Sequence, residues 1–218
     1  MNLILIRHGA TDWADKRLSG WMPGIHLNDY GRAQVEALPG RLAGVPLVAI
    51  YSSPLERALE TAQPVAAGRG LTIQVCQGLI EAGCGDWAGR TLEELHQEEL
   101  WPVIQVYPGG ARFPGGESLR ETQARIVAEL DAIRDAHPGQ TVAAFSHADP
   151  IKLAVAHYAG MPLDLYQRLT ISPASVTVLS FSRFGPRLLC VNHSDSLPVL
   201  PQDEPPKQEE QDRAQSVP

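Results

Sequence analysis

The sequence has few of the residues that mark secreted, zinc-binding or membrane-spanning proteins. It contains only three cysteines, Cys76, Cys84 and Cys190, with no C-x-x-C spacing, so neither a disulfide framework nor a zinc site is expected. Such thiol usage fits the cytoplasm. No apolar run approaches the roughly 18 residues needed to cross a bilayer. The apolar opening MNLILI is cut off by Arg7 and His8; it lacks the features of a signal peptide and predicts a buried strand.

A broad basic surface is also missing. The chain has 18 Lys and Arg against 25 Asp and Glu, a formal net charge of −7. This balance argues against nucleic acid as a partner. From Asp203 onward there are five acidic and two basic residues, so −3 of the −7 belongs to the C-terminal segment. A few arginines focused in a cleft can still attract an anion.

The patterns that are present predict an α/β protein. Its 218 residues suit one substantial domain. Short apolar runs at 3–6, 47–51 and 141–145 indicate buried strands, and helical periodicity over 55–65 and 119–133 indicates helices between them. This alternation predicts a three-layer sandwich, a mostly parallel sheet with helices on both faces. A terminal hairpin over 175–191 is expected to supply one antiparallel edge strand.

Three helix starts carry capping signals. Ser118 and Glu121 form a capping box. Ser53 is predicted as an N-cap, with Pro54 at the first helical position and Glu56 as the capping-box acid. Asp149 before Pro150 is expected to cap a third helix rather than act as a catalytic acid.

The composition changes near the C-terminus. From about Leu197, prolines alternate with Gln, Glu and Asp, and large apolar residues disappear after Leu200. Such a segment cannot bury enough apolar surface to offset its ordering entropy. We therefore predict one domain over 1–196 and a disordered tail over 197–218.

Polar side chains follow each of the three predicted strands. Arg7 and His8 follow the first, Arg57 lies just beyond the second, and His147 follows the third. Sites in open parallel sheets form outside the carboxyl ends of the strands. Arginine forks match phosphate oxygens, and a neutral imidazole can attack phosphorus. The sequence therefore predicts a phosphoryl-binding site at this edge.

The fuller pattern resembles the histidine phosphatase superfamily, which includes the cofactor-dependent phosphoglycerate mutases. The resemblance begins with Leu5-Ile6-Arg7-His8-Gly9-Ala10-Thr11 and continues in the family order over most of the chain from residue 3 to about 182. Its further blocks are 27–34, 52–62, 79–89, 115–118 and 146–147.

The resemblance implies a role for each site residue. His8 would be the nucleophile and become phosphorylated, while Arg7, Arg57 and His147 would bind the phosphoryl oxygens. Glu81 would protonate the departing alkoxide and later help water attack phosphohistidine. Arginines and imidazoles neutralise the charge, so neither a metal nor another cofactor is implied.

Two departures from the family pattern concern phosphate contacts. Ala14 stands where many relatives have Asn, so one contact is missing or is made by Thr11 or a backbone N–H. After His147 the common Gly-Gly is replaced by Ala148-Asp149, as in a phosphatase or probable-phosphomutase subgroup. The N–H of Ala148, at a helix N-terminus, could hold a phosphate oxygen.

The segment 90–114 resembles a lid over the site. Its only bases are Arg90 and Arg112, against four glutamates, so a second phosphate would find little support there. We therefore expect hydrolysis of a phosphomonoester, with mutase-type phosphoryl transfer as the alternative and a catalytically silent phosphate-binding module as a lesser one. A metal-dependent hydrolase built on His8, His147 and Asp149 lacks the acidic cluster that holds two metals. The expected partner is a phosphorylated small molecule of unspecified identity, and the resemblance allows a homodimer.

Overall fold

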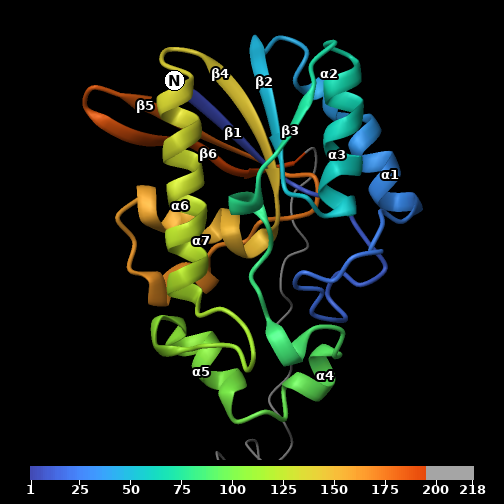
Figure 1. Cartoon of the computed structure of the whole chain (residues 1–218), viewed down its shortest axis with the longest axis vertical. Helices are drawn as coiled ribbons and strands as arrows, with labels where there is room; N and C mark the ends of the chain where they lie inside the picture. Colours follow the sequence, from blue (N-terminus) through green and yellow to red (C-terminus); the bar gives the residue numbers. More distant parts are fainter. Residues whose placement is uncertain (195–218) are drawn as a thin grey trace, which may run out of the picture.

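The computed structural model describes residues 1–194, which fold around a single six-stranded sheet (Figure 1). The strand order across the sheet is β3-β2-β4-β1-β5-β6. The strands are β1 (Asn2–Arg7), β2 (Leu47–Ser52), β3 (Ile73–Val75), β4 (Thr141–Ser146), β5 (Val176–Ser182) and β6 (Gly185–His193).

Strand directions confirm the predicted mostly parallel sheet. β1 pairs in parallel with β4, and β2 pairs in parallel with both β3 and β4. β5 runs antiparallel to β1 on one side and to β6 on the other. The terminal hairpin therefore completes the sheet as expected, with β6 at the edge and the antiparallel strand β5 one position inside it.

Helices cover both faces of this sheet, which confirms the three-layer architecture (Figure 1). α1, α2 and α3 lie on one side, and α6 and α7 on the other. α4 and α5 are short helices beyond the carboxyl edge of the parallel strands. The bounds are α1 (Asp29–Glu36), α2 (Leu38–Arg41), α3 (Glu56–Ala67), α4 (Leu92–Leu95), α5 (Leu100–Val106), α6 (Leu119–Ala136) and α7 (Ala148–Tyr158).

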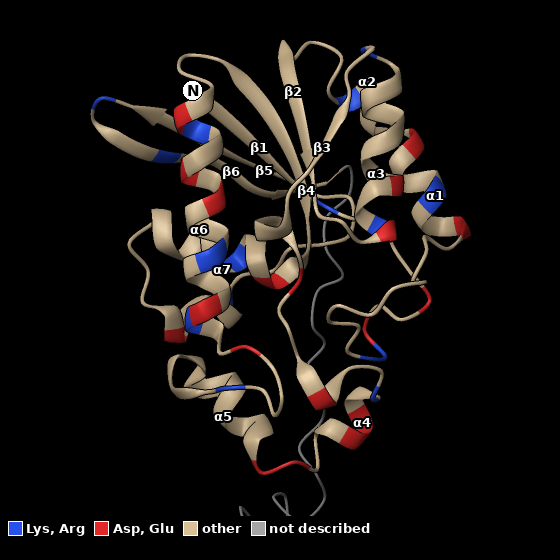
Figure 2. Ribbon diagram, in the orientation of Figure 1, with Lys and Arg blue, Asp and Glu red and all other residues tan. Residues whose placement is uncertain are grey.

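Alternation along β1 divides the core in two. Leu3 and Leu5 belong to the cluster that contains Ile126 of α6, whereas Ile4 and Ile6 belong to the cluster on the α1–α3 side. Successive strand residues point to opposite faces, so a strand covered on both sides is apolar throughout. Figure 2 shows the consequence: the inner strands carry almost no charge, while Lys, Arg, Asp and Glu lie on the helices and loops.

Of the three predicted helix starts, only the Ser118 capping box is confirmed. α3 begins at Glu56 with Leu55 as its N-cap, and its N-cap makes no side-chain hydrogen bond. α7 begins at Ala148 with His147 as its N-cap, so Asp149 lies inside the first turn. The predicted capping roles of Ser53 and Asp149 are therefore wrong. Ser53 lies two residues before the N-cap of α3, and Asp149 lies one residue inside α7.

Three further predictions concern the C-terminal tail, the lid and the absence of membrane-spanning segments. The predicted tail, 197–218, lies outside the described residues. The predicted lid, 90–114, contains α4, α5 and a 3₁₀ helix at Pro108–Gly110. Within residues 1–194 no helix is long and apolar enough to cross a membrane.

Candidate active site

The two site histidines become neighbours because their strands are neighbours. β1 and β4 pair in parallel with Arg7 opposite Ser146, so the residues that follow them, His8 and His147, meet at the carboxyl edge. Their ring centroids lie 5.1 Å apart, with the planes inclined at 60°. Arg57 enters from the first turn of α3, after β2.

The position of His8 defines its tautomer. Its Nδ1 lies 2.7 Å from the carbonyl oxygen of Gly9, and a carbonyl only accepts, so Nδ1 carries the proton and Nε2 keeps its lone pair. Burial, together with the charges of Arg7 and Arg57, holds the pKa of His8 well below its ordinary value. His8 is therefore neutral near pH 7, with a nucleophilic nitrogen available.

His147 is fully buried and is held by a serine. Its Nε2 lies 2.7 Å from the Ser53 hydroxyl, which also accepts from the Leu55 N–H at 3.4 Å. We assign the Ser53 proton to this bond, so that Nε2 accepts it and Nδ1 carries the ring proton. Burial and the charge of Arg57 lower the pKa of His147 well below its ordinary value.

Several buried donors at this edge have no acceptor within residues 1–194. They are Arg7 Nε, Arg57 Nε, Arg57 Nη1 and His147 Nδ1. The guanidiniums are anchored only in part, Arg57 Nη2 to the Gly20 carbonyl at 2.9 Å and Arg7 Nη1 to the Ile171 carbonyl at 2.6 Å. Buried polar groups in folded proteins normally find partners. A set of four unpaired donors indicates a site for a multiply accepting anion, such as a phosphoryl group.

Glu81 comes from the loop that follows the 3₁₀ helix Gln77–Leu79. One of its carboxylate oxygens accepts the Ala82 N–H at 2.8 Å. Burial, followed by the charge of Asp149, raises the pKa of Glu81 to about 7, against the opposing effects of Ala82, Arg57 and Arg7. A carboxyl with this pKa can donate and accept a proton near neutrality.

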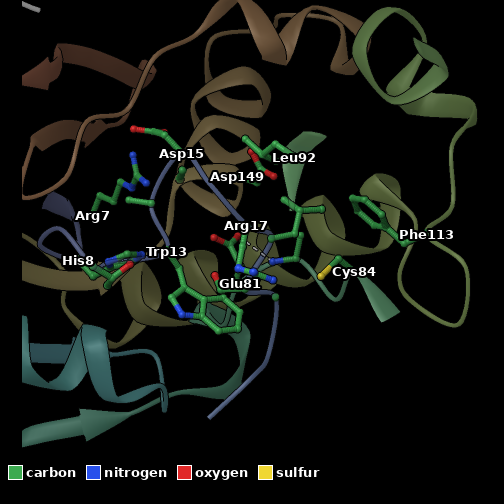
Figure 3. A pocket seen from close by; sticks show the side chains of 17 residues that line it. Arg7, His8, Trp13, Asp15, Arg17, Glu81, Cys84, Leu92, Phe113 and Asp149 are labelled. Atoms are coloured by element: carbon green, nitrogen blue, oxygen red, sulfur yellow. Dashed lines mark hydrogen bonds between the residues drawn. The ribbon is translucent and has the colours of Figure 1, made fainter. Parts of the chain in front are cut away.

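A cavity of about 200 Å³ opens at this edge. Of the predicted site residues, it is lined by Arg7, His8, Thr11, Glu81 and Ala148. Figure 3 shows Arg7 and His8 at one end of the cavity, with Glu81 further along it.

Two predicted phosphate ligands do not line the cavity. Arg57 and His147 are fully buried. Each nevertheless contacts a residue that lines it, His147 through the His8 ring and Arg57 through the Gly20 carbonyl. Both therefore lie directly against the cavity wall rather than in the open space.

The cavity also contains residues that the sequence did not reveal as site residues. Among them are Trp13, Asp15, Arg17, Leu92 and Phe113. They come from the segment between β1 and α1, from the first residue of α4 and from the segment before α6, and they share no spacing that marks a site. Asp149, predicted as a cap, lines the cavity beside Glu81 (Figure 3).

The described residues contain no group of three or more His, Cys, Asp or Glu side chains placed to hold a metal ion. The positive charges beside His8 are those of Arg7 and Arg57. Guanidinium groups of this kind can stabilise an oxyanion.

Two neutral imidazoles and two buried guanidiniums at the carboxyl edge of such a sheet define an enzyme that acts on phosphoryl groups. The chain belongs to the histidine phosphatase superfamily (branch 1), whose family model matches residues 3–194. This membership confirms the predicted resemblance, and with it the prediction of a phosphatase that works through phosphohistidine.

Relatives and solved structures agree with this assignment. Phosphoserine phosphatase 1 of Hydrogenobacter thermophilus is 29% identical over 182 residues, covering 82% of this chain and 86% of its own. The structure of YhfR from Bacillus stearothermophilus superposes with a TM-score of 0.84 at 31% identity, covering 89% of this chain and 98% of its own. A mycobacterial glucosyl-3-phosphoglycerate phosphatase gives a TM-score of 0.81 at 27% identity, covering 88% and 99%.

Proposed function

We propose that this chain hydrolyses a small phosphomonoester through a phosphohistidine formed on Nε2 of His8, with Glu81 as the general acid and base. One observation carries the proposal: a neutral His8 with a free Nε2 lies among buried donors that lack acceptors. A phosphoryl group supplies the missing acceptors and places phosphorus within reach of the nucleophile.

In the first step the Nε2 lone pair forms a bond to phosphorus, and the bond from phosphorus to the alkoxide breaks. Glu81 gives its proton to the alkoxide, which leaves as an alcohol. The His8 ring becomes cationic, and its Nδ1–H continues to donate to the Gly9 carbonyl. Arg7, Arg57 and His147 stabilise the charge on the phosphoryl oxygens, with the Thr11 hydroxyl and the Ala148 N–H as additional donors.

In the second step water replaces the alcohol. The Glu81 carboxylate takes a proton from water as the oxygen bonds to phosphorus, and the bond between phosphorus and Nε2 breaks. Inorganic phosphate leaves and His8 returns to its neutral form. The pKa of about 7 lets Glu81 serve in both directions.

The mutase alternative needs cations for a second phosphate. Arg90 pairs with Glu98 at 2.7 Å and Arg112 pairs with Glu121, and neither base lines the cavity. Figure 2 shows α4 carrying acidic residues instead. Beyond the phosphoryl site, Arg17 is the cavity's one basic side chain among the described residues, so hydrolysis is favoured.

The substrate we infer is small and polar. Beyond the phosphoryl site the cavity is lined by charged side chains, Asp15, Arg17 and Asp149, which suits a polar leaving group. Leu92 and Phe113 line it from the segment 90–114, which supports the proposal that this segment is a lid. The named relatives act on phosphoserine and on glucosyl-3-phosphoglycerate, and we propose a phosphorylated metabolite of comparable polarity here.

The predictions about cellular location, nucleic acid and a homodimer stay proposals. Cys76, Cys84 and Cys190 are all free thiols, which supports a cytoplasmic protein. The net charge of −7 supports a small-molecule partner rather than nucleic acid. A homodimer is proposed from the family resemblance alone.

The proposal is tested with p-nitrophenyl phosphate and a panel of phosphorylated metabolites, comparing wild type with His8→Ala. We expect turnover by wild type, unchanged by EDTA, and its loss in the variant. Equal and negligible rates in both proteins would favour a silent phosphate-binding module.

A further inference from the structure

The guanidinium of Arg125, on α6, uses all five of its N–H donors on one small region. Two go to the carboxylate of Glu117, from Nε at 3.0 Å and from Nη2 at 2.9 Å. The other three go to backbone carbonyls, those of Gly78 and Ile80 from Nη1, each at 2.9 Å, and that of Glu81 from Nη2 at 3.0 Å. An arginine has five donors in a rigid fork, and here none is left for solvent.

Glu117 also binds the loop of residues 78–83, at Gly83. Its Oε2 accepts the Gly83 N–H at 2.8 Å and the Thr122 hydroxyl at 3.1 Å, and its own N–H donates to the Gly83 carbonyl at 2.7 Å. The side chains of Arg125 and Glu117 are only 21% and 16% exposed. The pair is therefore well shielded, and its bonds are charge-assisted.

These contacts bracket Glu81. The Ile80 carbonyl, which precedes the Glu81 Cα, and the Glu81 carbonyl and Gly83 amide, which follow it, are all held by the pair. The Trp21 indole N–H also donates to the Glu81 carbonyl, at 2.5 Å. An ion pair that only joined α6 to Glu117 would need none of the carbonyl bonds. Their concentration on residues 78–83 indicates that the pair specifies the backbone from which the carboxyl projects.

We propose that Arg125, together with Glu117, is the positioning residue of Glu81, setting where its carboxyl stands relative to the leaving oxygen. The inference rests on the proposed acid role of Glu81. A displacement of about 1 Å in a catalytic group can cost roughly 100-fold in rate. The loss of rate affects the proton-transfer step, so its size depends on how strongly the leaving group needs a proton.

The test uses Arg125→Lys, which keeps the charge but loses the fork, and Glu117→Gln, which keeps the shape and leaves the carbonyl bonds in place. Arg134→Lys is the matched control on the same helix, because Arg134 pairs with Asp131 and Asp135, outside the cavity. Rates are measured with glycerol phosphate, a poor leaving group, and p-nitrophenyl phosphate, a good one. Circular dichroism establishes the temperature at which each variant is folded.

We expect Arg125→Lys to lose about 10- to 100-fold with glycerol phosphate and less than about 3-fold with p-nitrophenyl phosphate. Glu117→Gln should show a smaller loss in the same direction, and Arg134→Lys none. When Glu81→Gln is already present, Arg125→Lys should have little further effect with glycerol phosphate. If Arg125→Lys does not fold, Glu117→Gln tests the other half of the pair: it weakens the bonds to the Arg125 guanidinium, and its loss should again be larger with glycerol phosphate.

A loss that is equal for both esters, or that adds fully to Glu81→Gln, overturns the positioning role. If Glu81→Gln itself shows no dependence on the leaving group, the proposed function of Glu81 fails instead. The two failures are thereby distinguished.

Discussion

The imidazoles of His8 and His147 meet edge to face, 5.1 Å between centroids, and neither has a carboxylate partner among its hydrogen bonds. Burial, and the charges of Arg7 and Arg57, lower the pKa of both rings well below the ordinary value. Both rings therefore stay neutral at neutral pH. A nucleophile in this state needs no base to activate it, which leaves Glu81 free to act on the leaving group.

Glu81→Gln should slow esters with poor leaving groups by about 100-fold or more, because a general acid contributes roughly 10² to 10⁴. The effect with p-nitrophenyl phosphate should be much smaller, since nitrophenolate leaves without a proton. The measurement is kcat for both esters. A uniform loss would mean that Glu81 is not the acid.

The pH profile gives a second prediction about Glu81. Its pKa of about 7 means that the protonated form dominates below pH 7 and is lost above it. Turnover of glycerol phosphate should therefore fall as pH rises through about 7, and Glu81→Gln should remove that limb. Because p-nitrophenyl phosphate shares the ionisation of the phosphoryl group, a limb common to both esters is assigned to the substrate.

Asp149→Asn should move this limb to lower pH. The negative charge of Asp149 disfavours ionisation of Glu81 and helps raise its pKa, so removing that charge lowers the pKa. Asp15→Asn is the matched control, since Asp15 also lines the cavity but acts on the pKa of Arg7 rather than of Glu81. Equal shifts in the two variants would contradict the proposed effect of Asp149 on Glu81.

Ser53→Ala should lower kcat by up to roughly 100-fold, the lower end of the roughly 10²- to 10³-fold cost of losing an oriented donor, because Ser53 acts through His147. Among residues 1–194, the Ser53 hydroxyl is the hydrogen-bond partner that keeps the ring proton of His147 on Nδ1. Ser53→Thr, which restores a hydroxyl, should recover much of the rate. A folded Ser53→Ala variant with the kcat of wild type would show that the hydroxyl has no part in orienting His147. So would a folded Ser53→Thr variant that is no faster than Ser53→Ala.

Sequence patterns could predict the sheet and the centre of the site because both depend on local features. Buried parallel strands are continuous apolar runs, and their carboxyl ends must share an edge, so the sequence alone places Arg7, His8 and His147 together. The register that puts Arg7 opposite Ser146 could not be predicted. It is set by packing across the whole sheet.

Other features depend on contacts that leave no local pattern. The capping predictions for Ser53 and Asp149 are wrong because a short polar side chain before a helix can serve equally as a cap or as a site residue. The role of Arg125 has no sequence signal, because three of its partners are backbone carbonyls 44 to 47 residues away, which any residue type could supply. The same holds for the cavity lining from Leu92 and Phe113.

The most direct test of the account is to trap the phosphorylated enzyme during turnover. A ³²P-labelled substrate, quenched in the reaction, should leave an acid-labile, base-stable label on wild type that maps to His8. His8→Ala should carry no label. Label that survives in His8→Ala, or that maps to another residue in the wild type, would contradict the assignment of the nucleophile.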